Sequence, residues 1–125
     1  MDNVLTISDW WDGPVMGLAT YNGVICIYFR VFDIPEPEDE YLDEYFLTPI
    51  SDTEVEVIMK EWNEWCTAYS KNDLDSYYKK YQHNHSIHWI WEKSSEKNKY
   101  RKRATFTGNI GNGFIPVDFC VEWHD

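Results

Sequence analysis

The chain has 125 residues, of which 22 are acidic and 11 are basic, and its net charge is −11. That length suits one domain and is too short for two separate cores, so we expect residues 1–125 to form a single domain. An acidic chain repels nucleic-acid phosphates and anionic membrane surfaces, so neither is expected as a partner. The cysteines Cys26, Cys66 and Cys120 are too scattered for a disulfide framework or a cysteine metal site.

The N-terminus lacks the basic region and long apolar run of a secretory signal. The apolar segments fall short of the roughly 20 residues that span a bilayer. We therefore expect a soluble cytoplasmic protein, although export by a dedicated secretion system would need no such signal.

The first thirty residues predict β structure. Residues 15–20 and 24–32 are β-prone and flank Asn22-Gly23, a pair that predicts a hairpin with a type I′ turn. Residues 5–7 form a shorter β-prone run. Residues 9–14 have the composition of a turn built around two tryptophans.

Residues 33–44 interrupt this pattern. Pro35 and Pro37 disfavour helix before them, so the segment is expected to be an exposed acidic loop. Residues 45–50 predict a third strand, with Pro49 marking its end or a sheet edge.

The strongest helix signal begins at Ser51, because Ser51 and Glu54 have the spacing of a capping box. Apolar residues then recur at spacings of three and four, which predicts one apolar face of a helix ending near Ser70. That face consists of Val55, Ile58, Trp62, Trp65 and Tyr69. We expect Trp62 and Trp65 on the core side.

The remaining third of the chain is harder to assign. Residues 74–81 suit a short second helix, while residues 87–91 are compatible with a strand or a helix. Residues 93–103 are polar and mostly basic, and they predict a mobile connection. Residues 104–107 and 115–123 flank a glycine-rich stretch and predict a final hairpin. The expected fold class is α+β, with an antiparallel sheet of about four to six strands packed on one face by one or two helices.

Several motifs occur together in roughly the first 70 residues. The N-terminal stretch is Thr6-Ile7-Ser8-Asp9-Trp10-Trp11-Asp12-Gly13-Pro14, followed by Gly17-Leu18-Ala19 and Tyr21-Asn22-Gly23. Further along are Leu47-Thr48-Pro49-Ile50 and the helix through Trp62 and Trp65. With these motifs the chain resembles a group of small bacterial proteins of unknown function, and Trp-Asp-Gly-Pro is the most specific part of the likeness, from which the second half of the chain departs. The resemblance implies a bacterial origin and a single-domain build.

Three histidines are the weak candidates for a metal site: His83, His85 and His88. Their spacing suits neither element, because a helix separates His83 from the other two and a strand separates His88. We expect no metal and no cofactor. Asp9 and Asp12 flank two tryptophans, which resembles a sugar site, but a turn needs aspartates for the same positions. With no catalytic set in the sequence, we expect a protein that is not an enzyme.

Charge is distributed unevenly. Residues 1–59 contain 13 acidic residues and a single base, Arg30, whereas residues 60–125 contain nine acids and ten bases. An acidic, proline-stiffened loop would attract a basic protein, and its aromatic residues could anchor that protein. The residues expected to bind the partner are Glu36, Glu38, Asp39, Glu40, Tyr41, Asp43, Glu44 and Tyr45.

These features favour an immunity-type inhibitor that neutralises a cognate bacterial toxin, a basic domain such as a nuclease. One alternative is a phage or mobile-element protein whose carboxylates mimic DNA, which predicts charges spaced along an elongated face. Another is a small metal-dependent enzyme that uses the histidines. The sequence leaves the oligomeric state open.

Overall fold

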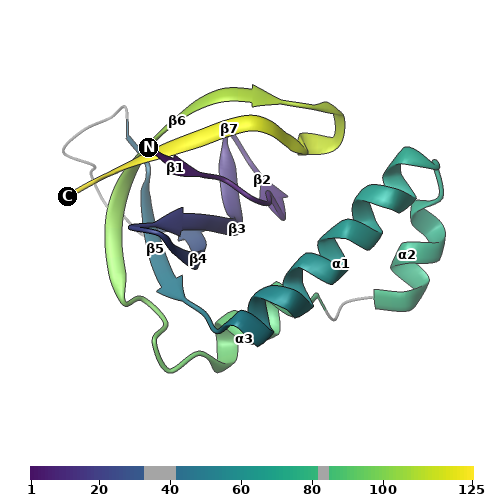
Figure 1. The fold of residues 1–125 in the computed structure, drawn as a ribbon, viewed down its shortest axis with the longest axis horizontal. Helices are drawn as coiled ribbons and strands as arrows, with labels where there is room; N and C mark the ends of the chain where they lie inside the picture. The colour runs from purple at the N-terminus through teal and green to yellow at the C-terminus, as the bar shows by residue number, and fades with distance from the viewer. Residues whose placement is uncertain (33–41, 82–84) are drawn as a thin grey trace. The chain divides into compact units, whose positions relative to one another are not determined.

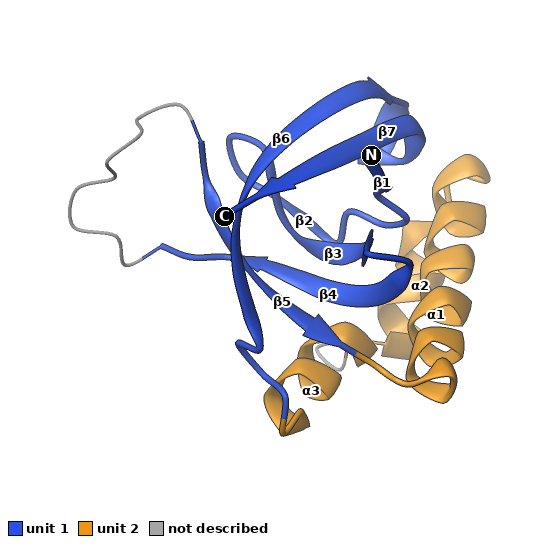
Figure 2. Cartoon of the chain, turned by 60° about the vertical axis from the view of Figure 1, so that its left-hand side comes forward, with its two compact units in different colours: residues 1–49, 96–125 blue, residues 50–95 orange. Residues whose placement is uncertain are grey.

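The computed structural model describes residues 1–32, 42–81 and 85–125. The chain forms two compact units (Figure 2): residues 1–49 with 96–125, and residues 50–95. The described strands belong to the first, here called the strand unit, and the described α-helices to the second, the helical unit (Figure 1). The single-domain assignment stays a prediction.

The strand unit contains one antiparallel sheet in the order β1-β7-β6-β5-β4-β3-β2. The strands are β1 (Asp2–Asn3), β2 (Asp9–Trp10), β3 (Pro14–Tyr21), β4 (Val24–Arg30), β5 (Glu44–Pro49), β6 (Tyr100–Ile110) and β7 (Pro116–His124). This confirms the α+β class and the antiparallel sheet. The seven strands of the described sheet exceed the predicted four to six, because the N-terminal stretch adds two very short ones.

That stretch closes the sheet on itself. Residues 2–3 pair with β7, and residues 9–10 pair with β3. Between them, the Val4 N–H donates to the Phe119 carbonyl at 3.1 Å, and the Leu5 N–H donates to the Leu18 carbonyl at 2.8 Å. The two ends of the strand order therefore belong to one continuous segment. The predicted strand at residues 5–7 is this bonded segment, although it lies between β1 and β2 rather than in a strand.

The hairpin predicted at Asn22-Gly23 is confirmed. Asn22 has φ 50° and Gly23 has φ 79°, the positive values that a type I′ turn needs. Tyr21 pairs with Val24, so the loop has two residues and the register of β3 against β4 follows from it.

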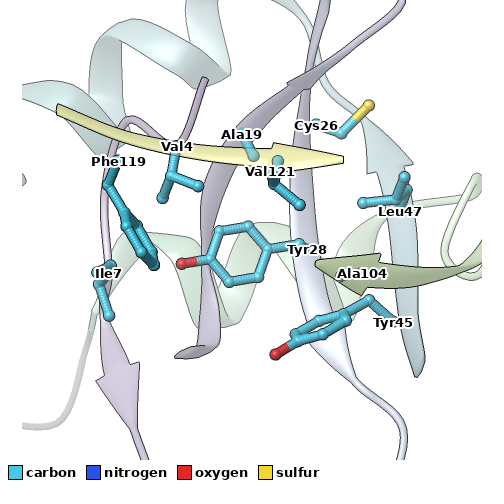
Figure 3. Packing of buried hydrophobic residues seen from close by; sticks show 10 residues of the cluster. All are labelled: Val4, Ile7, Ala19, Cys26, Tyr28, Tyr45, Leu47, Ala104, Phe119 and Val121. Carbon is cyan, nitrogen blue, oxygen red and sulfur yellow. The ribbon is translucent and has the colours of Figure 1, made fainter. Parts of the chain in front are cut away.

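The core of the strand unit is rich in aromatic rings. Figure 3 shows the Tyr28 and Tyr45 rings among smaller apolar side chains. The two rings meet edge to face with centroids 5.8 Å apart. The Tyr28 hydroxyl donates to the Thr6 carbonyl at 2.8 Å, and the Tyr45 hydroxyl donates to the Pro14 carbonyl. These bonds satisfy the polar ends of two fully buried side chains.

The buried tyrosines predict a loss of stability at alkaline pH. Burial raises the pKa of Tyr45 to about 12 and that of Tyr28 well above 10. Because the folded-state pKa exceeds the unfolded value, the stabilisation is complete below pH 10 and disappears as the pH rises towards 12. For Tyr45 alone, the free energy of unfolding should be about 1.3 kcal/mol lower at pH 11 than at pH 9. Urea unfolding at both pH values measures this difference, which should shrink in Tyr45→Phe.

The helical unit contains α1 (Asp52–Ser70), α2 (Leu74–Tyr81) and α3 (Ser86–Lys93). The predicted capping box is confirmed, since the Glu54 N–H donates to Ser51 Oγ at 3.2 Å and the Ser51 N–H donates to Glu54 Oε1 at 2.9 Å. The short second helix is also confirmed. The ambiguous run at residues 87–91 is helical. None of the described helices has both the length and the apolar character needed to cross a membrane.

One expectation about this half of the chain needs correction. Residues 93–103 are not entirely a connection, because β6 starts at Tyr100 and pairs with β5. On α1, Trp62 and Trp65 are half-buried, and their rings stack with centroids 5.5 Å apart. The fully buried residues of α1 are Ile58, which belongs to the predicted apolar face, and Glu61. The packing of helices against one sheet face stays a prediction.

Candidate partner-binding surface

The structure describes three of the eight residues that the sequence predicts to bind a partner: Asp43, Glu44 and Tyr45. The other five lie outside the described residues: Glu36, Glu38, Asp39, Glu40 and Tyr41. Their role therefore stays a prediction.

Tyr45 does not face a partner, and the structure corrects that prediction. It lies in the core with an exposed fraction of 0%, next to Tyr28. The error has a simple cause: Tyr45 follows two acidic residues, which made it look like part of the acidic loop. It is in fact the second residue of β5, where Tyr45 and Leu47 point inwards.

Asp43 and Glu44 differ in how exposed and how strongly paired their carboxylates are. Glu44 receives two bonds from the Arg101 guanidinium, one of them at 3.3 Å, so a base from β6 balances it. The Asp43 side chain is 57% exposed, and its carboxylate lies 3.7 Å from the Arg30 guanidinium. Asp43 is therefore the described member of the predicted set that presents its carboxylate most openly.

Arg30, the last residue of β4, holds the turn between β2 and β3 in place, an interaction that the sequence does not reveal. Its guanidinium donates to the carbonyls of Trp11 at 2.6 Å, Asp12 at 3.1 Å and Pro14 at 3.0 Å. The side chain is only 8% exposed, and hydrogen bonds from a buried charge are among the stronger ones in proteins. The β2–β3 turn is thus held by hydrogen bonds from the buried Arg30 guanidinium.

The turn also depends on its glycine. Gly13 has φ 113°, a conformation that L-residues rarely adopt, and an added Cβ would lie 2.9 Å from Arg30 Nη2. Asp12 itself has φ 52°. Asp9 lies in β2, where it pairs with Met16, and its carboxylate accepts a bond from the Trp10 N–H at 2.9 Å. The turn interpretation therefore holds for Asp12 but is wrong for Asp9.

Trp11, in this turn, forms an exposed aromatic pair with Phe32, which follows β4. Trp11 is 69% exposed and stacks on Phe32, which is 49% exposed, with centroids 5.9 Å apart. Large exposed aromatic side chains that are already fixed in place are typical of binding surfaces. We call Trp11, Asp12, Phe32 and Asp43 the aromatic–acidic surface. The sequence signals only one part of this surface, the Trp-Trp pair inside turn chemistry, and gives no sign that Phe32 and Asp43 join it.

The neighbouring tryptophan stacks on a second loop. Trp10 and Phe114 have ring centroids 4.7 Å apart. Phe114 follows Gly113 in the loop between β6 and β7, and it has φ 58°. A bulky residue in that region carries about 1–3 kcal/mol of strain. The strained loop holds the Phe114 ring, 47% exposed, against Trp10.

The predicted histidine cluster is only partly described. His83 lies outside the described residues. His85 Nδ1 lies 3.2 Å from Glu61 Oε1, while His88 is exposed. In the described part of the chain, no three histidine, cysteine, aspartate or glutamate side chains gather closely enough to hold a metal ion.

Glu61 is a buried carboxylate that the sequence did not single out. It accepts bonds from the Ser86 N–H at 2.8 Å, from the Ser86 hydroxyl and from the Tyr77 hydroxyl at 3.4 Å. Ser86 opens α3, whose N-cap residue, His85, makes no side-chain cap bond. Glu61 therefore caps α3 from α1, and its chemistry is structural.

The helical unit also contains a cleft of about 780 Å³ between α1 and α2. Its charged lining consists of three acids and three bases: Glu56, Glu64, Asp73, Lys60, Lys71 and Lys80. Glu64 already pairs with Lys80 at 3.0 Å. Because the acidic and basic side chains that line the cleft are equal in number, their net charge does not favour a basic partner.

The cysteines behave as structural residues. Burial raises the pKa of the Cys26 thiol to about 11 and raises that of the Cys66 thiol. Both therefore stay protonated at neutral pH and are poor nucleophiles. All three cysteines are free.

No protein-family model, curated protein or solved structure matches this chain. The resemblance of its N-terminal motif to small bacterial proteins stays a prediction. The geometry of the aromatic–acidic surface is accordingly the basis for a functional proposal.

Proposed function

We propose that this chain is an immunity-type inhibitor, which binds and neutralises a cognate bacterial toxin with a basic surface. The observation that carries the proposal is the exposed Trp11–Phe32 pair. Arg30 holds the turn that contains Trp11, and in the sequence Phe32 is followed directly by the acidic segment. A rigid aromatic anchor beside concentrated negative charge is the chemistry that tight inhibitors of basic proteins use.

The two parts of this surface have different roles in the proposal. Ten acids and no base lie between Asp33 and Glu56, and such a field speeds the arrival of a basic protein. Trp11 and Phe32 offer apolar area whose ordering on binding costs little, because Arg30 already holds the turn. Charge should therefore govern the association rate, and the aromatic pair the dissociation rate.

A four-residue neutralisation tests the role of charge. Replacing Glu36, Glu38, Asp39 and Glu40 by Gln or Asn should slow association with the partner by about tenfold at low salt and flatten its salt dependence. Stability should hardly change, since solvated charges contribute little to it. The measurement is a pull-down from the source bacterium, followed by binding kinetics at low and high salt.

The matched control removes four exposed charges elsewhere: Asp75, Asp118, Glu122 and Asp125. The control changes the net charge by the same amount as the first variant. If the position of the acidic charges matters, the control should slow association much less than the first variant does. A captured partner that is acidic would contradict the proposal. So would an association rate that ignores both salt and the first variant.

A further inference from the structure

We propose that the aromatic–acidic surface receives an arginine side chain of the partner. The guanidinium would stack on Trp11 and Phe32 and donate hydrogen bonds to the carboxylates of Asp12 and Asp43. This inference rests on the proposed function, because it names the group that a basic partner would present.

The four side chains belong to three segments that meet at one point, the Arg30 guanidinium. Its Nη2 atom lies 3.1 Å from the Asp12 carbonyl oxygen and 3.7 Å from Asp43 Oδ2. Its Cζ atom lies 5.8 Å from the centroid of the Phe32 ring, on which Trp11 stacks. Residues distant in sequence are thus assembled into one surface by a buried side chain.

The charge of this surface suits a second cation. The Asp43 carboxylate lies beside the Arg30 guanidinium, and Asp12, whose backbone carbonyl accepts from the same guanidinium, carries a second carboxylate. Asp12, Asp43 and Arg30 together therefore have a net charge of −1. The three carbonyl oxygens that accept from Arg30 further offset its charge. Asp12 is exposed and Asp43 largely so, which leaves both carboxylates able to accept from a partner.

Arginine fits this surface better than lysine. A guanidinium is planar, stacks on aromatic faces and donates along two edges at once, whereas an ammonium is a compact, strongly hydrated charge. A cation over an exposed aromatic ring is attracted by the negative face of the ring. Each carboxylate adds a charge-assisted hydrogen bond.

The test is a titration of the whole, ¹⁵N-labelled chain followed through its seven tryptophan indole N–H resonances. The probe is the peptide acetyl-Gly-Arg-Gly-amide, and the matched control replaces its arginine by citrulline, which has nearly the same shape and no charge. We expect the Trp11 resonance to shift and saturate with the arginine peptide alone. Phe32→Ala, Asp12→Asn and Asp43→Asn should each weaken binding about twofold to fivefold.

Trp89 supplies an internal control, because it is 42% exposed and lies beside Lys93 in the helical unit. Its resonance should not move. An equal shift with citrulline, an equal shift at Trp89, or unchanged affinity in the three variants would overturn the inference.

The outcomes separate this inference from the proposed function. If the arginine peptide fails to shift Trp11 while a basic partner still binds with salt-dependent kinetics, the inference fails and the function stands. If the peptide binds as expected but the partner captured from the bacterium is acidic, the immunity function fails.

Discussion

Replacing Arg30 by Met is expected to lower the free energy of unfolding by about 3–5 kcal/mol. The side chain is buried, and its guanidinium satisfies the carbonyls of Trp11, Asp12 and Pro14. Methionine fills much of the same volume but donates nothing, so the carbonyls of Trp11 and Asp12 lose the guanidinium donor and Asp43 loses its nearby cation. The Pro14 carbonyl keeps the bond from the Tyr45 hydroxyl. The cost should therefore exceed that of losing a surface ion pair.

Urea unfolding of the full chain measures this loss, and Arg101→Met is the matched control. Arg101 is also paired with a carboxylate, that of Glu44, but its side chain is 51% exposed. Its replacement should change stability by less than about 1 kcal/mol. Arg30→Lys should fall between the two variants, because an ammonium keeps the charge but cannot reach all three carbonyls. Equal losses for Arg30→Met and Arg101→Met would refute the assigned role of Arg30.

The same variant links stability to the proposed binding surface. Trp11 and Asp12 belong to the turn that Arg30 holds, and Phe32 lies against its guanidinium. Loss of Arg30 should therefore loosen the anchor before binding and raise the entropy cost of ordering it.

The parts of the fold that the sequence predicted well depend on neighbouring residues. The turn at Asn22-Gly23 follows from the positive φ that both residues tolerate. The start of α1 follows from Ser51 and Glu54, three residues apart. Such local signals need no knowledge of what lies across the fold.

Short apolar runs and mixed compositions carried less information. Residues 87–91 are too few to distinguish the period of a helix from that of a strand, so their sequence is compatible with both, whereas the structure has the helix α3 there. The prediction for Tyr45 is wrong because the acidic residues before it suggest an exposed loop, whereas its side chain points into the core. The start of β6 was missed because its first residues are mostly basic, although they pair with β5.

The candidate surface was out of reach of sequence reasoning for a different reason. Arg30 bonds to residues 16 to 19 positions away, and no periodic pattern connects them. The sequence shows two adjacent tryptophans at the N-terminal turn, but the stacking of Trp11 on Phe32 and of Trp10 on Phe114 depends on how the sheet brings the segments together. The structure removes Tyr45 from the predicted partner-binding set, whereas the role of the acids in that set stays a prediction.

Glu61 presents the same problem in the helical unit, and it leads to the second large effect. Replacing Glu61 by Met should lower the free energy of unfolding by about 2–4 kcal/mol, because the N–H and hydroxyl of Ser86 and the hydroxyl of Tyr77 lose their acceptor. Glu64→Gln is the control on the same helix. Its carboxylate pairs with Lys80 nearer the surface, so the loss should stay below about 1 kcal/mol.

A double-mutant cycle with Ser86→Ala shows whether the effect comes from the cap of α3. If Glu61 acts through Ser86, the two substitutions should be non-additive by about 0.5–3 kcal/mol, since either one already removes the bond between their side chains. Hydrogen exchange gives a local readout, because the Ser86 amide donates to Glu61 Oε2 at 2.8 Å and should exchange faster in Glu61→Met than in Glu64→Gln. Additive losses, together with unchanged exchange at Ser86, would show that Glu61 stabilises the helical unit by some route other than capping α3.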